Sequence, residues 1–107
     1  MRVNIKPFSV NKAWKGRRYR TDEYKAWSQE LTYLLKAMEI PEGPLELRIT
    51  WGVSNMQSDT DNPCKPFQDV LSAYLGINDS RFRKITLEKV KTAKKAEFID
   101  YEILSFG

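Results

Sequence analysis

The sequence predicts an α/β domain in which two helices pack on a mixed sheet. Four segments have the pattern or composition of strands, and two have apolar residues at the 3.6-residue spacing of helices. Their order along the chain is β-α-β-α-β-β, which is typical of this fold class. A chain of 107 residues also has the size of one domain, so we expect residues 1–107 to form a single unit.

The N-terminal part is expected to contain a strand, a loop and the first helix. Apolar and polar residues alternate over residues 2–9, which predicts a strand, whereas the basic stretch 11–20 has no apolar period and predicts a loop. Thr21 is a suitable cap for the helix that follows. That helix should end at the segment PEGP, residues 41–44. Its apolar positions are Tyr24, Trp27, Leu31, Leu34, Leu35 and Met38.

A second strand and the second helix are expected next. Residues 45–53 alternate throughout and form the clearest strand of the chain, and a polar loop, 54–60, follows them. Asp61 or Asn62 can cap the next helix, and Pro63 suits a first helical position. The apolar stripe of this helix consists of Phe67, Val70, Leu71, Tyr74 and Leu75.

The C-terminal part is expected to form two strands. Gly76 is predicted to stop the second helix because glycine readily adopts the left-handed conformation found at helix ends. The segment INDSRF then turns the chain. Residues 82–91 and 96–104 are predicted to be strands joined as a hairpin around TAKK, with Ile99, Tyr101 and Ile103 facing the core.

Composition excludes several kinds of site. The chain has no histidine, which excludes Ser-His-Asp and Cys-His catalysis and histidine-ligated zinc, so any metal ion would need oxygen ligands. Its one cysteine, Cys64, excludes an internal disulfide and fits a reducing compartment. The sequence contains no apolar run of membrane-spanning length and no secretory signal, so we expect a cytoplasmic protein that does not bind membranes. The formal net charge of +4 is compatible with an anionic partner.

Two aspartates before the second helix suggest a metal site. Residues two apart on an extended segment point to the same side, so Asp59 and Asp61 would project their carboxylates together. Such a pair repels unless a cation lies between its members, and Mg²⁺ prefers oxygen ligands of this type. Lys65 lies one helical turn further on the same side. The spacing alone equally allows a capped helix with an exposed ion pair between Lys65 and Asp69.

The same segment carries a resemblance to a known family. The stretch DTDNPCKPFQDVLSAYLGINDSRF resembles the signature of the RusA-type Holliday junction resolvases. That signature is Asp-x-Asp-Asn-x-x-Lys, then an aspartate and a leucine on the same helix, and later a turn with a second acidic site. The basic segment SVNKAWKGRRYR is also similar to the family, so the resemblance covers most of the chain. The matching residues of the signature are Asp59, Asp61, Asn62, Lys65, Asp69, Leu71 and Asp79.

The resemblance implies a structure-specific endonuclease that resolves four-way DNA junctions in recombination and repair. Members of this family act as homodimers with Mg²⁺, or Mn²⁺, and cut two opposed strands symmetrically. Carried over to this chain, Asp59, Asp61 and Asp79 would hold the metal ion, and Lys65 would assist the chemistry. Two alternatives remain open: a DNA-binding protein of the same fold without catalysis, and a metal nuclease that acts on other branched DNA such as flaps.

Basic residues in two parts of the chain, the N-terminal stretch 11–20 and the segment after Asp79, are candidate DNA contacts. Arginine and lysine supply phosphate contacts, and the aromatic residues among them can stack on bases. Arg81 and Arg83 follow Asp79 directly and could meet the same DNA backbone, although they could equally be surface charges of a strand. In the N-terminal basic stretch, which could also be a solvated loop, the candidates are Asn11, Lys12, Lys15, Arg17, Arg18 and Arg20.

Overall fold

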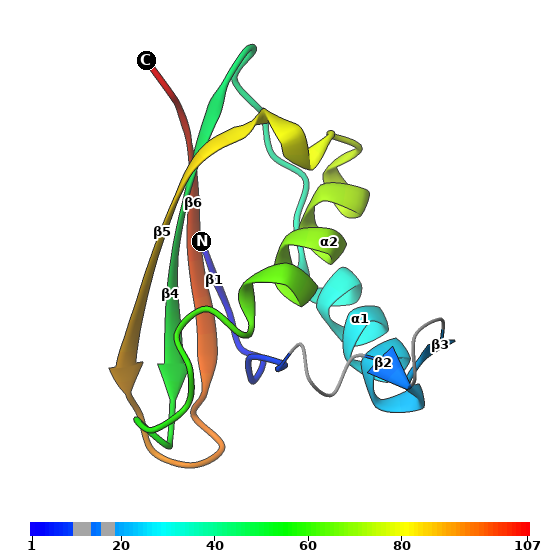
Figure 1. Cartoon of the computed structure of the whole chain (residues 1–107), viewed down its shortest axis with the longest axis vertical. Coiled ribbons are helices and arrows are strands. Elements are labelled where there is room, and N and C mark those ends of the chain that lie inside the picture. The colour runs from blue at the N-terminus through cyan, green and yellow to red at the C-terminus, as the bar shows by residue number, and fades with distance from the viewer. Residues whose placement is uncertain (10–13, 16–18) are drawn as a thin grey trace.

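A four-stranded sheet with both helices on one of its faces forms the body of the molecule, as the computed structural model shows (Figure 1). The structure describes residues 1–9, 14–15 and 19–107, and for residues 14–15 and 19–20 it describes the backbone only. The helices are α1, Asp22–Leu34, and α2, Cys64–Leu75. The sheet contains β1, Arg2–Val3, β4, Leu45–Val53, β5, Phe82–Lys91, and β6, Phe98–Ser105.

The sheet is mixed, with the strand order β1-β6-β4-β5. The central strand β4 is parallel to β5 and antiparallel to β6, while β1 is antiparallel to β6. This arrangement confirms the predicted α/β class, the mixed sheet and the two helices. A parallel pair needs a crossover connection, and α2 supplies it between β4 and β5. The segments that enter and leave α2 are therefore each joined to the sheet at one end and to the helix at the other.

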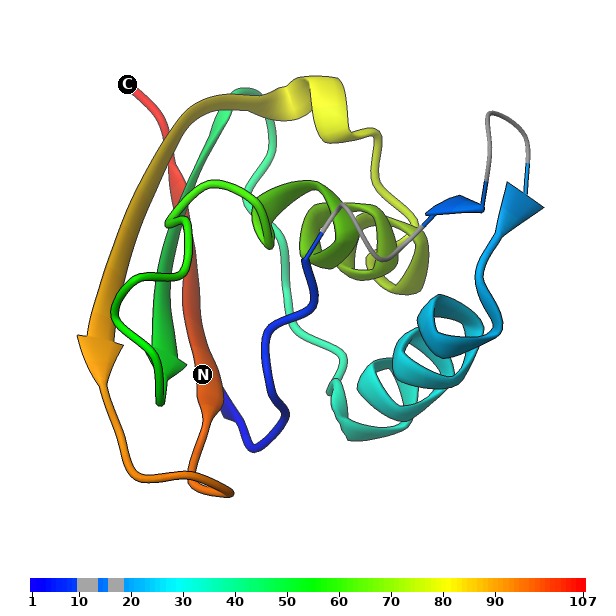
Figure 2. The ribbon, with the colours of Figure 1, turned by 60° about the horizontal axis from the view of Figure 1, so that its bottom comes forward.

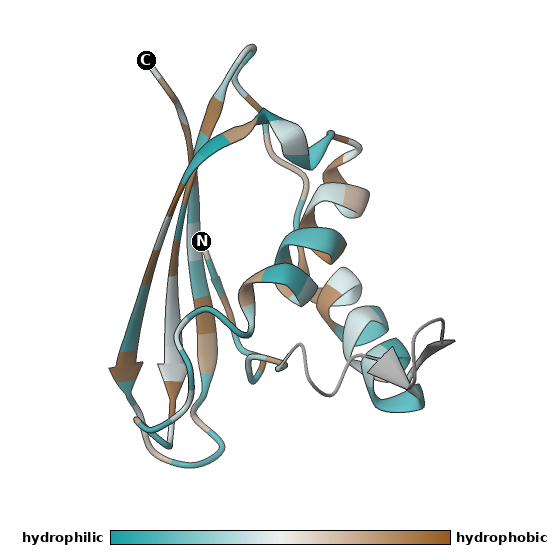
Figure 3. Cartoon of the chain, viewed as in Figure 1, coloured by the Kyte–Doolittle hydropathy of each residue, from teal (hydrophilic) through white to brown (hydrophobic). Residues whose placement is uncertain are grey.

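The core lies between the sheet and the helices. Alternate residues of β4 point into it, and Leu45, Leu47 and Trp51 are completely buried. The apolar stripe of α2 meets them, because the rings of Trp51 and Phe67 pack edge to face at 5.8 Å. Apolar segments, brown in Figure 3, alternate with polar ones along the helices and strands, as expected for elements with one buried face.

The N-terminal region differs from the prediction. The first strand ends at Val3, because the Ile5 N–H donates to the Val3 carbonyl at 2.9 Å and so turns the chain out of the sheet. Within the stretch predicted as a loop, β2, Trp14–Lys15, pairs antiparallel with β3, Tyr19–Arg20. The predicted cap of α1 is confirmed, since the Thr21 hydroxyl accepts the Tyr24 N–H at 3.1 Å.

Both helices have boundaries that the sequence did not predict. α1 ends at Leu34, well before PEGP, and Leu35 is extended but only 5% exposed. The apolar spacing beyond the helix therefore belongs to an extended segment that also packs on the core. α2 begins at Cys64, after Pro63, and no side chain caps it, so the predicted capping by Asp61 or Asn62 is wrong.

The predicted C-terminal hairpin is also wrong. Residues 82–91 form β5 as predicted, and β6 begins at Phe98, but the two strands do not pair with each other. They lie on opposite sides of β4, and their connection crosses the end of β4, where the Thr92 N–H donates to the Val53 carbonyl at 2.8 Å. Most residues of β4 are buried, as expected for a strand that lies inside the sheet between β5 and β6. The inward orientation predicted for Ile99, Tyr101 and Ile103 is confirmed.

Candidate functional site

The predicted site residues lie on the two segments that flank α2. The entering loop, residues 54–63, runs from the end of β4 across the helix-bearing face of the sheet to α2 (Figure 2). The leaving segment, residues 76–81, runs from the end of α2 to β5. These segments carry the candidate carboxylates, and the first turn of α2 carries Lys65.

The C-terminal end of α2 explains how Asp79 approaches Lys65. Gly76 adopts the left-handed conformation with φ 68°. Its N–H donates to the Ala73 carbonyl at 3.3 Å, and the Ile77 N–H donates to the Ser72 carbonyl at 3.1 Å, which together form a Schellman motif. The motif reverses the chain, so the following short 3₁₀ helix, Asp79–Arg81, labelled η2, packs beside α2.

Lys65 lies between two carboxylates. Its Nζ is 2.8 Å from Oδ1 of Asp69 on the next turn of α2 and 3.8 Å from Oδ2 of Asp79. The hydrogen bond to Asp69, with smaller contributions from the charges of Asp69 and Asp79, raises the pKa of Lys65 above its ordinary value. Lys65 is therefore an ammonium at neutral pH. It can donate hydrogen bonds and offset negative charge, but it has no free amine to act as a base.

The entering loop presents Asp59 and Asp61 to solvent. Its residues form turns and bends and not an extended strand. The prediction that the two side chains project together assumed an extended segment, which the loop does not have. Asp59 Oδ2 accepts a hydrogen bond from the Asn62 side chain at 2.7 Å. Asn62 thus orients a candidate metal ligand. The sequence predicted Asn62 as a helix cap and did not predict this contact.

Trp51 holds this loop against the sheet. Its ring is fully buried in β4, and its Nε1–H donates to the Thr60 carbonyl at 2.7 Å, between the two aspartates in sequence. The sequence predicted the apolar role of Trp51 but not this bond. The signal was present in principle, because a buried indole N–H nearly always needs an acceptor.

The candidate carboxylates do not form a ready metal site. Within residues 1–9 and 21–107, no group of three Asp, Glu, Cys or His side chains lies close enough to hold an ion. The donor chemistry fits a hard divalent cation, since the available ligands are carboxylate oxygens. The geometry differs from a finished site, since Asp79 faces the ammonium of Lys65 and Asp59 is bonded to Asn62.

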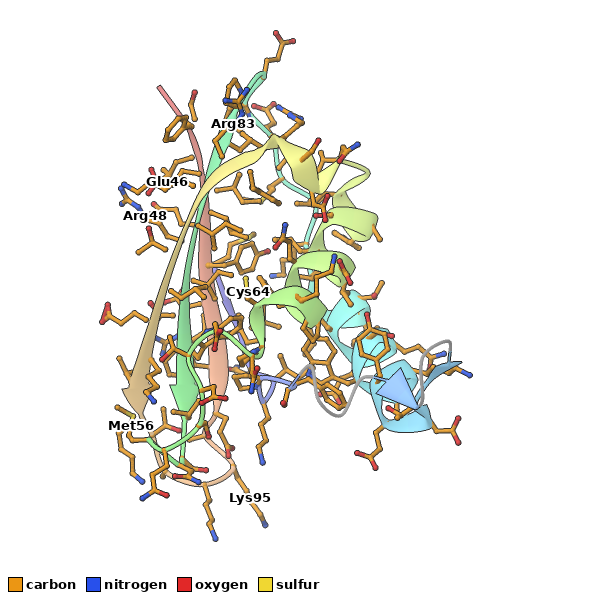
Figure 4. The ribbon with its side chains drawn as sticks, in the orientation of Figure 1. Glu46, Arg48, Met56, Cys64, Arg83 and Lys95 are labelled. Carbon is orange, nitrogen blue, oxygen red and sulfur yellow. The ribbon has the colours of Figure 1, made fainter. Side chains whose placement is uncertain are left out.

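Cys64 lies at the start of α2 (Figure 4) and directly precedes Lys65 in the sequence. Burial raises the pKa of its thiol, and the nearby charges of Asp61 and Asp69 raise it further. The thiol thus keeps its proton at neutral pH, which makes it a poor nucleophile. The chemistry of the site is therefore carried by the carboxylates and Lys65.

A cavity of ≈ 600 Å³ opens next to Asp59. It lies between the N-terminal segment, α1 and the entering loop, and its wall includes the aromatic rings of Phe8 and Trp27. Asp59 and Asn62 line it, whereas Lys65 and Asp79 do not. The carboxylate of Asp59 therefore borders a hollow large enough for part of a ligand.

The candidate DNA contacts are only partly described. Arg83 is exposed at the start of β5. Arg81 is turned inward, since its guanidinium donates to the carbonyls of Gly43, at 3.1 Å, and Pro41, which occupies two of its five N–H groups. Lys15 and Arg20 lie in β2 and β3, and their side chains are outside the described part of the chain. Four further candidates lie wholly outside the described residues: Asn11, Lys12, Arg17 and Arg18.

Comparison with known proteins identifies a family. The model of the family described as Endodeoxyribonuclease RusA matches residues 5–99, which is most of the chain. The match includes both segments that flank α2 and therefore all the carboxylates discussed above. None of the curated proteins searched matches the chain.

Proposed function

The chain belongs to the RusA family of endodeoxyribonucleases, and on that premise we propose that it resolves four-way DNA junctions with the help of a divalent metal ion. The observation that supports a catalytic site most directly is the arrangement of Lys65, Asp69 and Asp79. A protonated lysine held at 2.8 Å and 3.8 Å from two carboxylates places positive charge among acidic side chains at the surface. A positioned ammonium of this kind can stabilise the negative charge that develops on a phosphodiester during cleavage.

In this proposal Asp59, Asp61 and Asp79 are the ligands of Mg²⁺, or of Mn²⁺ in its place. A bound ion of this kind supplies an activated water and offsets charge on the phosphate. Two of the ligands are exposed on the entering loop, and the third is on the leaving segment. Since no three of the described carboxylates converge in the chain alone, we expect ion binding to draw them together.

The proposed role of Lys65 is to stabilise charge. Because its raised pKa keeps the amine protonated, it can donate to a phosphate oxygen or to the leaving oxygen. Asp69 orients it through the 2.8 Å hydrogen bond. Lys65 is thus proposed as a catalytic residue, and Asp69 as its positioning residue.

The proposed DNA contacts lie on either side of the carboxylates. Arg83 is exposed close to η2 and can reach phosphates near the cleavage point. Arg81 retains three N–H groups beyond those that bind Gly43 and Pro41. The N-terminal contribution is proposed to come from Asn11, Lys12, Lys15, Arg17, Arg18 and Arg20.

Two further properties belong to the proposal. Resolving a junction takes two related incisions, and we propose that a homodimer provides them. We also propose that the protein acts in the cytoplasm, where a single free thiol such as Cys64 is stable. In the described residues, no helix is long and apolar enough to cross a membrane. Fractionation of cells that express the protein tests its location, and recovery outside the cytoplasm would contradict this part.

A cleavage experiment with matched DNA substrates tests the proposed function. The purified full-length chain is incubated with a four-way junction, a flap and a linear duplex of the same sequence, with Mg²⁺ or with EDTA. We expect paired nicks in the junction only, and only with Mg²⁺. Binding without cleavage would favour the inactive DNA-binding alternative, whereas preferential cleavage of the flap would favour the other nuclease. Cleavage in EDTA would remove the metal from the proposal.

A further inference from the structure

The loop that carries Asp59 and Asp61 is held by a lysine from β5. The ammonium of Lys89 donates to the carbonyls of Met56 and Ser58, each at 2.6 Å. Together with the Trp51 bond to Thr60, these contacts fix three carbonyls at alternate positions of the entering loop. The fixed stretch begins before Asp59 and ends next to Asp61.

The sheet register explains why these two side chains reach the same loop. Trp51 and Lys89 are directly paired in the parallel ladder of β4 and β5. Partners in a ladder point to the same face, which here is the face that the helices and the loop cover. Lys89 is accordingly half-buried, although most of β5 is exposed.

The contacts of Lys89 are local to the loop. Across the described side chains, Lys89 forms no ion pair with a carboxylate, and both of its hydrogen bonds end on loop carbonyls. Before Asp59, the loop has two internal bonds among the described residues: the Ser58 N–H donates to the Asn55 carbonyl at 3.1 Å, and the Gln57 N–H donates to the Asn55 side chain at 3.0 Å. Those bonds close one turn but do not tie it to the sheet.

We propose that Lys89 is a positioning residue of the cleavage site, which holds the entering loop so that Asp59 and Asp61 can bind the metal ion. The inference rests on the function proposed above. Lys89 does not touch DNA or metal in this role. It acts through the backbone of the loop and changes the reaction rate only by positioning the metal ligands Asp59 and Asp61.

Three variants separate this role from the alternatives. Lys89→Met keeps the length of the side chain but removes its N–H donors, whereas Lys89→Arg keeps charge and donors. Lys91→Met is the matched control: Lys91 lies two residues away on β5, and its ammonium donates to the carbonyl of Ser54, where the loop begins. Each full-length variant is compared with wild type by junction-cleavage kinetics, Mg²⁺ titration and amide hydrogen exchange.

The expected result is a selective loss in Lys89→Met. Its kcat should fall by about tenfold to a hundredfold, as a misplacement of about 1 Å can cause, and more Mg²⁺ should be needed for half-maximal cleavage. Its KM for the junction should not change, since Lys89 does not bind DNA in this proposal. Amides 56–60 should exchange faster while those of β4 do not. Lys89→Arg should restore most of the activity, and Lys91→Met should behave as wild type.

Several outcomes would overturn the inference. An increase in KM at constant kcat would make Lys89 a phosphate contact. Equal losses in both methionine variants would show that the effect is not specific to the carbonyls that Lys89 holds, because Lys91 also donates to the loop, at Ser54. Unchanged exchange of amides 56–60 in Lys89→Met would show that the lysine does not hold the loop. If wild type itself fails to cleave junctions, the proposed function fails. Mn²⁺-induced broadening of the Asp59 and Asp61 amide signals, weaker in Lys89→Met, would then still support the positioning role, and equal broadening would contradict it.

Discussion

At the scale of single residues, the charge of Lys65 determines which chemistry it can perform. The hydrogen bond to Asp69 raises its pKa, so the ion pairs of Lys65 are complete below the ordinary lysine pKa and are lost only as pH rises through the raised one. We therefore predict that cleavage does not decline through deprotonation of Lys65 until the pH exceeds that ordinary value. Lys65→Arg, which stays charged, should retain activity at still higher pH, measured as a pH–rate profile. A rate that rises as Lys65 loses its proton would instead make the amine a base.

Replacing one of the three proposed metal ligands should abolish most cleavage without preventing DNA binding. Asp59→Asn, Asp61→Asn and Asp79→Asn each remove a ligand charge but little bulk, so cleavage should fall by about a hundredfold or more while junction binding persists. Asp100→Asn is a matched control, because Asp100 pairs with Arg2 at 3.5 Å on β6, away from the site. Single-turnover cleavage and gel-shift binding measure the two effects. Wild-type activity in any of the three variants would remove that residue from the ligand set.

At the scale of elements, the turn after α2 assembles part of the site. Gly76→Ala forces a side chain into the left-handed region, which costs about 1–2 kcal/mol. Among the described residues, no atom beyond the two chain neighbours lies within 4 Å of the added Cβ, so no clash adds to this cost. For Gly76→Ala we predict a loss of stability of this size in urea unfolding. We also predict reduced cleavage, because the turn brings Asp79 to Lys65. Gly43→Ala is the control: its φ is +81° and its Cβ is also unobstructed. It should lose similar stability but keep its activity per folded molecule, and equal losses of activity would contradict this role of the turn.

The spacing of apolar residues predicted where a strand lies, but it did not predict every helix end or which strands pair. Residues 45–53 alternate along their whole length, and the strand has those bounds. The apolar spacing of Leu35 predicted helix, but an extended chain buries that side chain equally well. The false hairpin arose because β5 and β6 are neighbours in sequence, whereas their places in the sheet are set by the burial of β4 between them.

The same distinction applies to the candidate site. Helical spacing predicted the pair of Lys65 and Asp69, since residues four apart lie on one face. The approach of Asp79 to Lys65 depends on the conformation of Gly76, which the sequence indicates only as a helix stop. Lys89 gave no signal at all, because its partners are 33 and 31 residues away in the chain. Contacts of this range depend on the sheet register.

The basic segment around β2 and β3 permits a second test at this scale. Replacing Arg17, Arg18 and Arg20 by alanine should weaken binding to every DNA shape and flatten its salt dependence, by roughly 0.9 in slope for each lost phosphate contact. The control is Lys94→Ala with Lys95→Ala, which removes exposed charge from the connection between β5 and β6. Binding at several salt concentrations gives the slope. An equal change per charge in both sets would show that only net charge matters.

At the scale of the whole molecule, one chain offers one set of candidate carboxylates, whereas a four-way junction has two strands related by two-fold symmetry. Closed two-fold association is the commonest way to duplicate a site in a related orientation. We therefore predict a homodimer, with twice the chain mass of 12.5 kDa by light scattering and nicks at symmetric positions on opposed strands.

Mixing subunits tests whether the two sites of such a dimer act together. Wild type mixed with excess Asp61→Asn should form heterodimers with one intact site, which nick one strand and leave the junction unresolved. Mixing with Asp100→Asn is the control and should leave paired incision intact. The two-nick product should fall with the square of the wild-type fraction, because both sites of one dimer are needed, while single nicks should fall less steeply. Monomers in solution and on DNA, each nicking independently, would give equal linear declines and would contradict symmetric resolution.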